Sequence, residues 1–315
     1  MIDFRYHLVS LIAVFLAVAL GIVIGTTALN GLLLDDLEGQ VSALEQDKRS
    51  LEDQTRSLQA RLDAEDQFEI AVAPALVDGA LADSSVLLVV ADDDVDTETV
   101  EEVGDLIRQA GGTVAGQITL TPEFSDPSSE SSLQSYATGS GLPAGITLPE
   151  VDDAGQLVGS LLAQVLMVPP GGGEPDSAAT SSVLAGLPAL EVLRIESESV
   201  APADYAVVLT DGELTDDQAE ERTANLVELV EALDQAGSGV VVAGNAISAR
   251  ENGLVGTVRS DPELAAAVST VDNINAPAGR ISTVLALRAE GEGTSGAYGT
   301  GEDTQPVPPL QAATP

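Results

Sequence analysis

The chain contains no cysteine and no tryptophan, and its only histidine is His7. Without cysteine it forms no disulfide, offers no thiolate to a metal and has no thiol nucleophile. Without histidine after position 7, imidazole acid–base catalysis and imidazole metal sites are excluded from almost the whole chain. No Walker A sequence is present, and no GxGxxG follows an expected strand. We therefore expect a protein that is not an enzyme and that carries no resident cofactor.

Basic residues are also scarce, with 12 Lys and Arg against 51 Asp and Glu, which gives a net charge of −39 at pH 7. From Glu69 onward, 40 acids oppose 7 bases, a net charge of −33. Such a field repels phosphate backbones and anionic lipid surfaces, so nucleic acid is excluded as a partner. The simplest interpretation of the excess acid is solubility.

Charged residues are absent from residues 8–34. About 20 apolar helical residues span a bilayer, so residues 1–34 are predicted to form a short cytoplasmic N-terminus and one transmembrane helix. Arg5 and His7 precede the apolar run and Asp35 follows it, which places the N-terminus inside and the body outside. A cleaved signal peptide with Thr26-x-Ala28 at its cleavage site is the alternative, although signal-peptide apolar regions run only about 7–15 residues.

Small residues occupy every fourth position of the apolar run. They are Ala13, Ala17, Gly21 and Gly25. A stripe of small side chains lets two membrane helices approach closely, which favours self-association. The alternative is that Gly and Ala are simply common in membrane helices.

Residues 35–70 carry a leucine at every seventh position. These leucines are Leu37, Leu44, Leu51 and Leu58. Together with Val41 and Leu62 they predict a short coiled coil, in which polar Lys48 and Thr55 favour a low oligomer number. We expect a homodimer or low homo-oligomer held by the anchor and the coil. An amphipathic helix packed on its own body is the alternative.

Residues 71–289 are expected to form an extracytoplasmic α/β domain with a mainly parallel sheet, because short apolar runs alternate with helical periods. Two similar β-α-β halves stand out, with Thr97 as the expected helix N-cap of the first and Gly111 as its stop. The segments of the halves are 85–91, 97–110 and 112–120, then 205–210, 216–236 and 240–243.

Further elements are expected outside the two halves. They are helices at 150–167 and 276–289 and strands at 190–195 and 267–271. Residues 121–149 and 169–182 are rich in Ser, Gly and Pro and are expected to be long loops. Residues 290–315 are rich in Gly, Thr and Pro and are expected to be a disordered tail.

One acidic cluster follows the first buried strand, and it consists of Asp92, Asp93, Asp94 and Asp96. Ligands of open α/β sheets bind outside the carboxyl ends of the strands, and carboxylates there can hold Mg²⁺ or Ca²⁺. The alternative is a solvated loop whose acids favour the N-terminus of the next helix. Asp211 and Glu213 occupy the matching place in the second half.

The N-terminal string MIDFRYHLVS at residues 1–10, followed by GIVIGT at 21–26, closely resembles the actinobacterial copper transporter family MctB. The resemblance continues through VDN at 271–273, PAGR at 277–280 and YG at 298–299. It implies an envelope protein of copper export and homeostasis, in which copper is the transported ion and an oligomeric pore is one picture. A second picture is a coiled-coil adaptor that recruits or activates a peptidoglycan hydrolase in cell separation.

The residues themselves add two constraints to the resemblance. Cu(I) prefers Cys and Met and Cu(II) prefers imidazole, and after residue 7 the chain offers only Met167. A single anchor also cannot line a channel without oligomerising. One apolar helix favours the inner membrane, although the family assignment implies the outer one.

Overall fold

The computed structural model describes residues 4–139, 142–143, 145–151 and 153–309, and for residues 26–38 it describes the backbone alone. The chain divides into two units, Met1–Glu65 and Asp66–Pro315. Helix α1, Phe4–Val77, runs through the first unit and into the second. Residues 40–73 contain neither Gly nor Pro, which explains why the helix continues beyond the expected coil.

The first unit begins with a strongly apolar stretch of α1. Phe4–Gly25 has a mean hydropathy of 2.9 and is long enough to cross a membrane. Further along the helix, ion pairs one turn apart support it, with Arg49 to Glu45 at 3.0 Å and Lys48 to Glu52 at 3.5 Å.

The second unit is built on one sheet, to which the described residues contribute seven strands in the order β3-β2-β1-β4-β5-β6-β7. All neighbours pair in parallel except β2 and β3. The strands are β1 Ser85–Val90, β2 Thr113–Leu120, β3 Leu193–Ile195, β4 Tyr205–Thr210, β5 Val240–Gly244, β6 Ser269–Val271 and β7 Ala297–Tyr298. The expected mainly parallel α/β domain is confirmed, and the similarity of its two halves stays a prediction.

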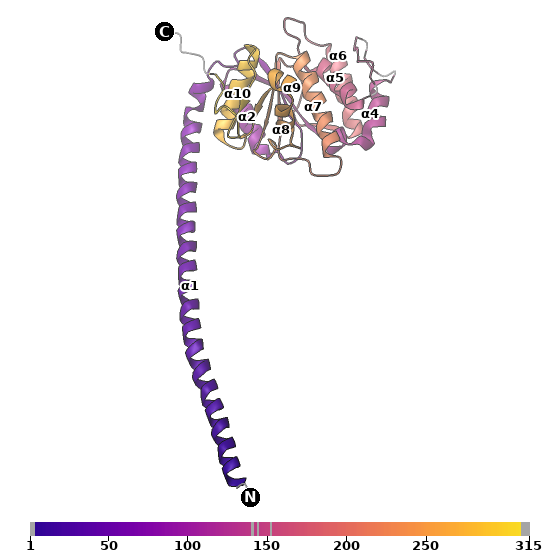
Figure 1. Ribbon diagram of the computed structural model, residues 1–315. Coiled ribbons are helices and arrows are strands. Elements are labelled where there is room, and N and C mark those ends of the chain that lie inside the picture. Colours follow the sequence, from indigo (N-terminus) through magenta and orange to yellow (C-terminus); the bar gives the residue numbers. More distant parts are fainter. Residues whose placement is uncertain (1–3, 140–141, 144, 152, 310–315) are drawn as a thin grey trace. The chain divides into compact units, whose positions relative to one another are not determined.

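Helices cover both faces of the sheet. One face packs against α2, Thr97–Gln109, against α10, Pro277–Gly291, and against Ala73 and Val77 at the end of α1. The other face packs against α5, Ala154–Leu166, α7, Ala219–Ala236, and α8, Leu254–Ser260. Figure 1 shows α2 and α10 together on one side of the strands and α5 and α7 on the other.

Burial on both faces explains the continuous apolar runs of the central strands. In β1, Leu87 and Val89 belong to one core and Val86 and Leu88 to the other, all at most 3 % exposed. The strand order reverses between β1 and β4, because β2 lies on one side of this pair and β5 on the other. In doubly wound sheets this is the point where ligands bind, at the carboxyl ends of the strands.

Several elements differ from the sequence-based expectations. The segment 121–149 is not one loop, because it forms α3, Pro122–Ser125, the 3-10 turn Pro127–Ser129 and α4, Glu130–Ala137. Helix α6, Ser177–Gly186, begins inside the second expected loop, and the 3-10 turn Leu187–Leu190 follows it. A further short helix, α9, spans Pro262–Ala267. Asp126 accepts a backbone N–H at the start of the 3-10 turn Pro127–Ser129, and Asp176 does so at the start of α6. The polar residues in these segments therefore cap helix starts.

The tail also differs from the expectation of disorder, which is wrong for residues 290–309. Strand β7 pairs with β6, and Tyr298 is 1 % exposed. Residue Gln305 then bridges back to Tyr298, with its N–H donating to Ala297 O at 2.9 Å. A buried aromatic ring and backbone pairing therefore offset the ordering cost that the composition suggested. Residues 310–315 lie outside the described residues.

Candidate functional site

An Asp or Asn follows each of four neighbouring parallel strands. Asp92 follows β1, Asp211 follows β4, Asn245 follows β5 and Asp272 follows β6. Carboxyl ends of parallel strands meet at one edge of the sheet, so these four residues form a row there. Sequence reasoning named the first two and missed the other two, since the alternation of strands does not reveal which strands are neighbours.

Within this row, Asp92 lies at the point where the strand order reverses, and it accepts most of the hydrogen bonds there. Its Oδ2 accepts hydrogen bonds from Thr210 Oγ1 and from the Asp211 N–H, both at 2.9 Å. Its Oδ1 accepts one from the Asp94 N–H at 3.2 Å. Three donors therefore hold this carboxylate between β1 and β4.

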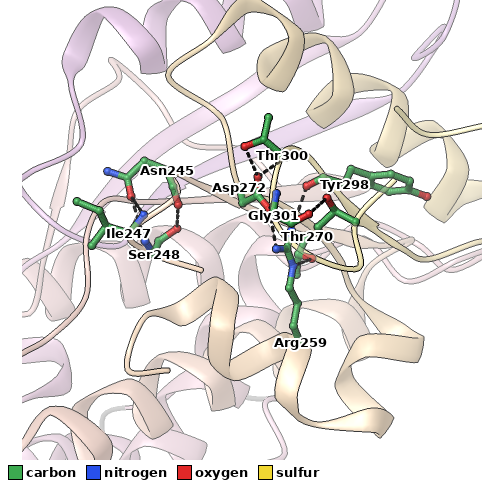
Figure 2. Close-up of polar contacts among 10 residues, drawn as sticks. Asn245, Ile247, Ser248, Arg259, Thr270, Asp272, Tyr298, Thr300 and Gly301 are labelled. Atoms are coloured by element: carbon green, nitrogen blue, oxygen red, sulfur yellow. Dashed lines mark hydrogen bonds and ion pairs between the residues drawn. The ribbon is translucent and has the colours of Figure 1, made fainter. Parts of the chain in front are cut away.

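Asn245 extends the network to β5. Its side-chain amide donates to Asp211 Oδ1, while its Oδ1 accepts from the backbone N–H groups of Ile247 at 2.9 Å and Ser248 at 3.0 Å. Figure 2 shows Asn245 holding the loop that follows β5 in this way. Asp92, Asp211 and Asn245 thus form one hydrogen-bonded chain across three strand ends.

The two carboxyl groups of this hydrogen-bonded chain, those of Asp92 and Asp211, have shifted pKa values. Burial raises the pKa of Asp92 to about 6, against the opposing effect of its hydrogen bonds from Asp211, Thr210 and Asp94. Burial, together with the negative charge of Asp94, also raises the pKa of Asp211. These groups therefore gain or lose charge closer to neutral pH than ordinary aspartates do.

A cavity of about 210 Å³ opens beside this chain. Its walls come from the segments after β1, β2 and β4, from α7, and from the start of α8. Arg222 of α7 lines it and is held by Asp216 at 2.7 Å and by Ser125 Oγ at 3.3 Å. The cavity thus combines carboxyls, hydroxyls and one guanidinium that is already paired.

Three residues of the predicted metal site, Asp92, Asp93 and Asp94, line this cavity, and Asp96 does not. Asp92 faces Thr210, Asp93 pairs with Arg194, and Asp96 caps α2 by accepting the Glu98 N–H at 3.1 Å. Within the described residues, no three His, Cys, Asp or Glu side chains are grouped so that they could hold a metal ion. Asp96, not Thr97, is the N-cap of α2, whereas Gly111 follows the helix end with φ +85°, as expected of a stop.

Asp272 plays a different part at the β6 end of the row. Its carboxylate, 1 % exposed, pairs with Arg259 Nη1 at 2.7 Å and accepts the N–H groups of Thr300 at 2.7 Å and Gly301 at 3.1 Å. Arg259 also donates to Thr270 Oγ1 at 2.8 Å and to Tyr298 O at 3.0 Å. Figure 2 shows Arg259 reaching towards Asp272, with Thr300, Gly301 and Tyr298 around them. This network binds the C-terminal segment to the sheet.

The residues predicted to mediate oligomerisation lie on α1 in the first unit. The side chains of Leu44, Leu51 and Leu58 are 69, 63 and 57 % exposed. Ala17, Gly21 and Gly25 are exposed as well, and a Cβ at either glycine would have no neighbour within 4 Å. The Leu37 backbone is helical, and its side chain lies outside the described residues.

Comparison with known proteins places the chain in one family along nearly its full length. The model of the family described as "Copper transport outer membrane protein, MctB" matches residues 1–309. Proteins named "Copper transporter MctB" from Mycobacterium tuberculosis (strain ATCC 25618 / H37Rv) and Mycobacterium bovis are 35 % identical over 312 residues, covering 98 % of this chain and 99 % of theirs. The protein of that name from Mycobacterium leprae is 34 % identical over 316 residues, covering 96 % of this chain and 97 % of its own.

These matches extend from the apolar helix to the C-terminal segment, so they include every element described above. The apolar helix Phe4–Gly25 and the membrane designation of the family agree that this is a membrane-anchored protein. The sequence resemblance at both ends of the chain is confirmed: the protein belongs to the MctB family.

Proposed function

We propose that the protein acts in copper transport and homeostasis as a membrane-anchored component of the cell envelope. The observation that carries this proposal is the family relationship, which spans the whole chain at 35 % identity to proteins named as copper transporters. Because the similarity includes the anchor, the coil and the body, the proposal concerns the complete architecture.

The chemistry of the chain limits how copper can be handled. Met167, the one soft ligand of the body, is 1 % exposed and packed in the core. Histidine and cysteine are absent from the body. Since copper prefers sulfur and imidazole ligands, we propose that the body handles copper through its negative charge or through a partner rather than in a resident centre.

The topology we propose has the N-terminus in the cytoplasm and the body outside. Arg5 and His7 precede the span, and the acid-rich chain follows it, in line with the positive-inside rule. A single helix favours the inner membrane, because outer membranes are usually crossed by barrels, whereas the family description favours the outer one. We also propose that the protein is not an enzyme.

Self-association is part of the same proposal. The unpartnered leucines of α1 support a homodimer, since Leu44 and Leu51 expose more than three-fifths of their surface. The open space around Gly21 and Gly25 supports a close approach of two anchors. A dimer would pair both stripes at once.

Cell-associated copper in a deletion strain, against the same strain carrying the gene, tests the proposal. Copper should rise on deletion and return on complementation, while zinc and manganese measured in the same samples stay constant. Unchanged copper would reject the transport role. A separation defect with unchanged copper would instead favour the adaptor that recruits a peptidoglycan hydrolase.

A further inference from the structure

Glu290 is a buried carboxyl in the last turn of α10, and its environment is incomplete for a carboxylate. The residue is 8 % exposed, and its Oε1 has no hydrogen-bond partner. Among the described residues no Lys, Arg or His forms an ion pair with it, and the negative charge of Asp234 on α7 acts to raise its pKa. A buried, unpaired negative charge at the C-terminal end of a helix is unfavourable on all three counts.

The packing around Glu290 leaves it little room to turn towards solvent. A Cβ on Gly239 would lie 2.5 Å from the Glu290 Cβ, so the chain before β5 approaches this side chain closely. Ser269 on β6 lies beside the carboxyl, and hydrogen bonding from its hydroxyl and its N–H acts to lower the pKa of Glu290, although Oε1 itself has no partner of hydrogen-bond geometry. Tyr298 of β7 is the other titratable group that the carboxyl influences.

The hydrogen bonds around Ser295 indicate that Glu290 carries a proton. Ser295 Oγ lies 3.1 Å from Ala267 O and 3.0 Å from Glu290 Oε2. A hydroxyl has one proton to donate, so it cannot serve both acceptors. If Glu290 carries a proton on Oε2, it donates to Ser295 Oγ, and Ser295 donates to Ala267 O, so that every short contact is a hydrogen bond.

We propose that Glu290 is a proton-operated clasp for the C-terminal segment. In its neutral form it completes the relay Glu290 Oε2–H to Ser295 Oγ–H to Ala267 O. The relay joins the end of α10, the connection to β7 and the end of α9. Loss of the proton leaves Ser295 with two acceptors for one hydrogen and leaves a buried charge near Asp234, so the clasp weakens.

The pH range of the clasp follows from its burial. Burial raises the pKa of Glu290 to about 7 from 4.5, against the opposing effect of hydrogen bonds from Ser269 and Ser295, and the negative charge of Asp234 acts in the same direction as burial. The folded segment therefore holds the proton more tightly than the opened one. The clasp is complete below about pH 4.5, weakens as the pH rises towards 7, and has lost the proton's contribution above that.

Hydrogen exchange of residues 292–301 in the full-length, detergent-solubilised protein, corrected for intrinsic rates, tests the clasp. Between pH 5.5 and 8, we expect the opening equilibrium of this segment to increase by about tenfold or more. In Glu290→Gln, the side-chain amide donates to Ser295 at every pH, so protection should become independent of pH.

Glu228→Gln is the matched control. Burial also raises the pKa of Glu228 to about 7, but this residue lies on α7 among Asp153 and Asn225 and does not contact the C-terminal segment. This variant should keep the pH dependence at 292–301. Equal protection at both pH values in the unmodified protein, or the same loss in Glu290→Gln, would overturn the proposal. Ser295→Ala breaks the relay but leaves Glu290 buried, so protection at pH 5.5 should fall while part of the pH dependence remains.

Discussion

At the scale of single residues, Asp272 and Asp92 show that an aspartate at the same edge of the sheet can have two different roles. Asp272 pairs with Arg259 and accepts hydrogen bonds from two backbone N–H groups, and the ion pair is largely buried. Among the described residues no Lys, Arg or His forms an ion pair with Asp92, and the three hydrogen bonds that it accepts come from neutral donors. The first is therefore a structural anchor, and the second is the group whose charge responds to its surroundings.

Replacing Asp272 should be among the most damaging single changes to the body. Asp272→Ala removes the carboxylate that pairs with Arg259, whose side chain is 18 % exposed, and it removes the acceptor of the Thr300 and Gly301 N–H groups. We expect a loss of about 3 kcal/mol in the free energy of unfolding, measured by urea denaturation. Asp93→Ala, which removes the exposed pair with Arg194, should cost less than about 1 kcal/mol. Equal costs for the two variants would contradict this assignment.

Asp92 should make the stability of the body depend on pH. Because its folded pKa is raised to about 6 from 3.8, the folded state binds the proton more tightly than the unfolded one. The stability it contributes is greatest below pH 3.8 and falls as the pH rises to about 6. Asp92→Asn should flatten this part of the urea-midpoint profile. Glu101→Gln, a change at an exposed position of α2, should leave it in place.

At the scale of elements, two helical glycines differ in what surrounds them. In α10, a Cβ on Gly279 would lie 2.0 Å from the backbone oxygen of Asn273, which leaves no space for a methyl group. In α2, a Cβ on Gly104 would meet only side-chain atoms at 3.6 Å or more. The start of α10 therefore depends on its glycine, and the middle of α2 does not.

We expect opposite outcomes for alanine at these two glycines. Gly279→Ala should destabilise the body by about 1–3 kcal/mol, because the loop after β6 must move away from α10. Gly104→Ala should be neutral or stabilise by up to about 1 kcal/mol, because alanine favours the helix. Thermal unfolding of both variants under one condition measures the difference. A destabilised Gly104→Ala variant would show that the α2 face is tighter than these contacts indicate.

The elements also show where sequence reasoning succeeds. Strands β1 and β4 are predictable because burial on both faces requires an unbroken apolar run. Strand β7 is not, since two residues carry no period and their burial depends on Arg259 and Asp272, which lie far away in the sequence. The candidate site divides in the same way. Asp92 and Asp211 follow strands that composition reveals, whereas the part of Asn245 depends on β5 lying beside β4.

At the scale of the whole molecule, the leucines of the coil predict an oligomer, and the folding of the body does not depend on them. Leu44 and Leu51 are exposed on the isolated chain, so Leu44→Asp together with Leu51→Asp should leave the unfolding of the body unchanged. The same changes should shift the full-length protein towards monomer in sedimentation in detergent. Ser50→Asp, on the polar side of the heptad, is the control and should have no effect. An unchanged mass in the double variant would remove the coil from the proposed function.

The two outer strands of the sheet carry a consequence for the behaviour of the protein at high concentration. An exposed strand edge is a template on which other chains can add strands and aggregate. Here one edge of the sheet is β3, which is three residues long and contains the charged Arg194. The other edge is β7, which is two residues long and is followed by Gln305, which bridges to Tyr298. Loss of the segment after Gly296, by proteolysis or by a premature stop, would uncover the β6 edge. The truncated protein should then be prone to self-templated fibre growth, against which the intact C-terminus is a steric guard.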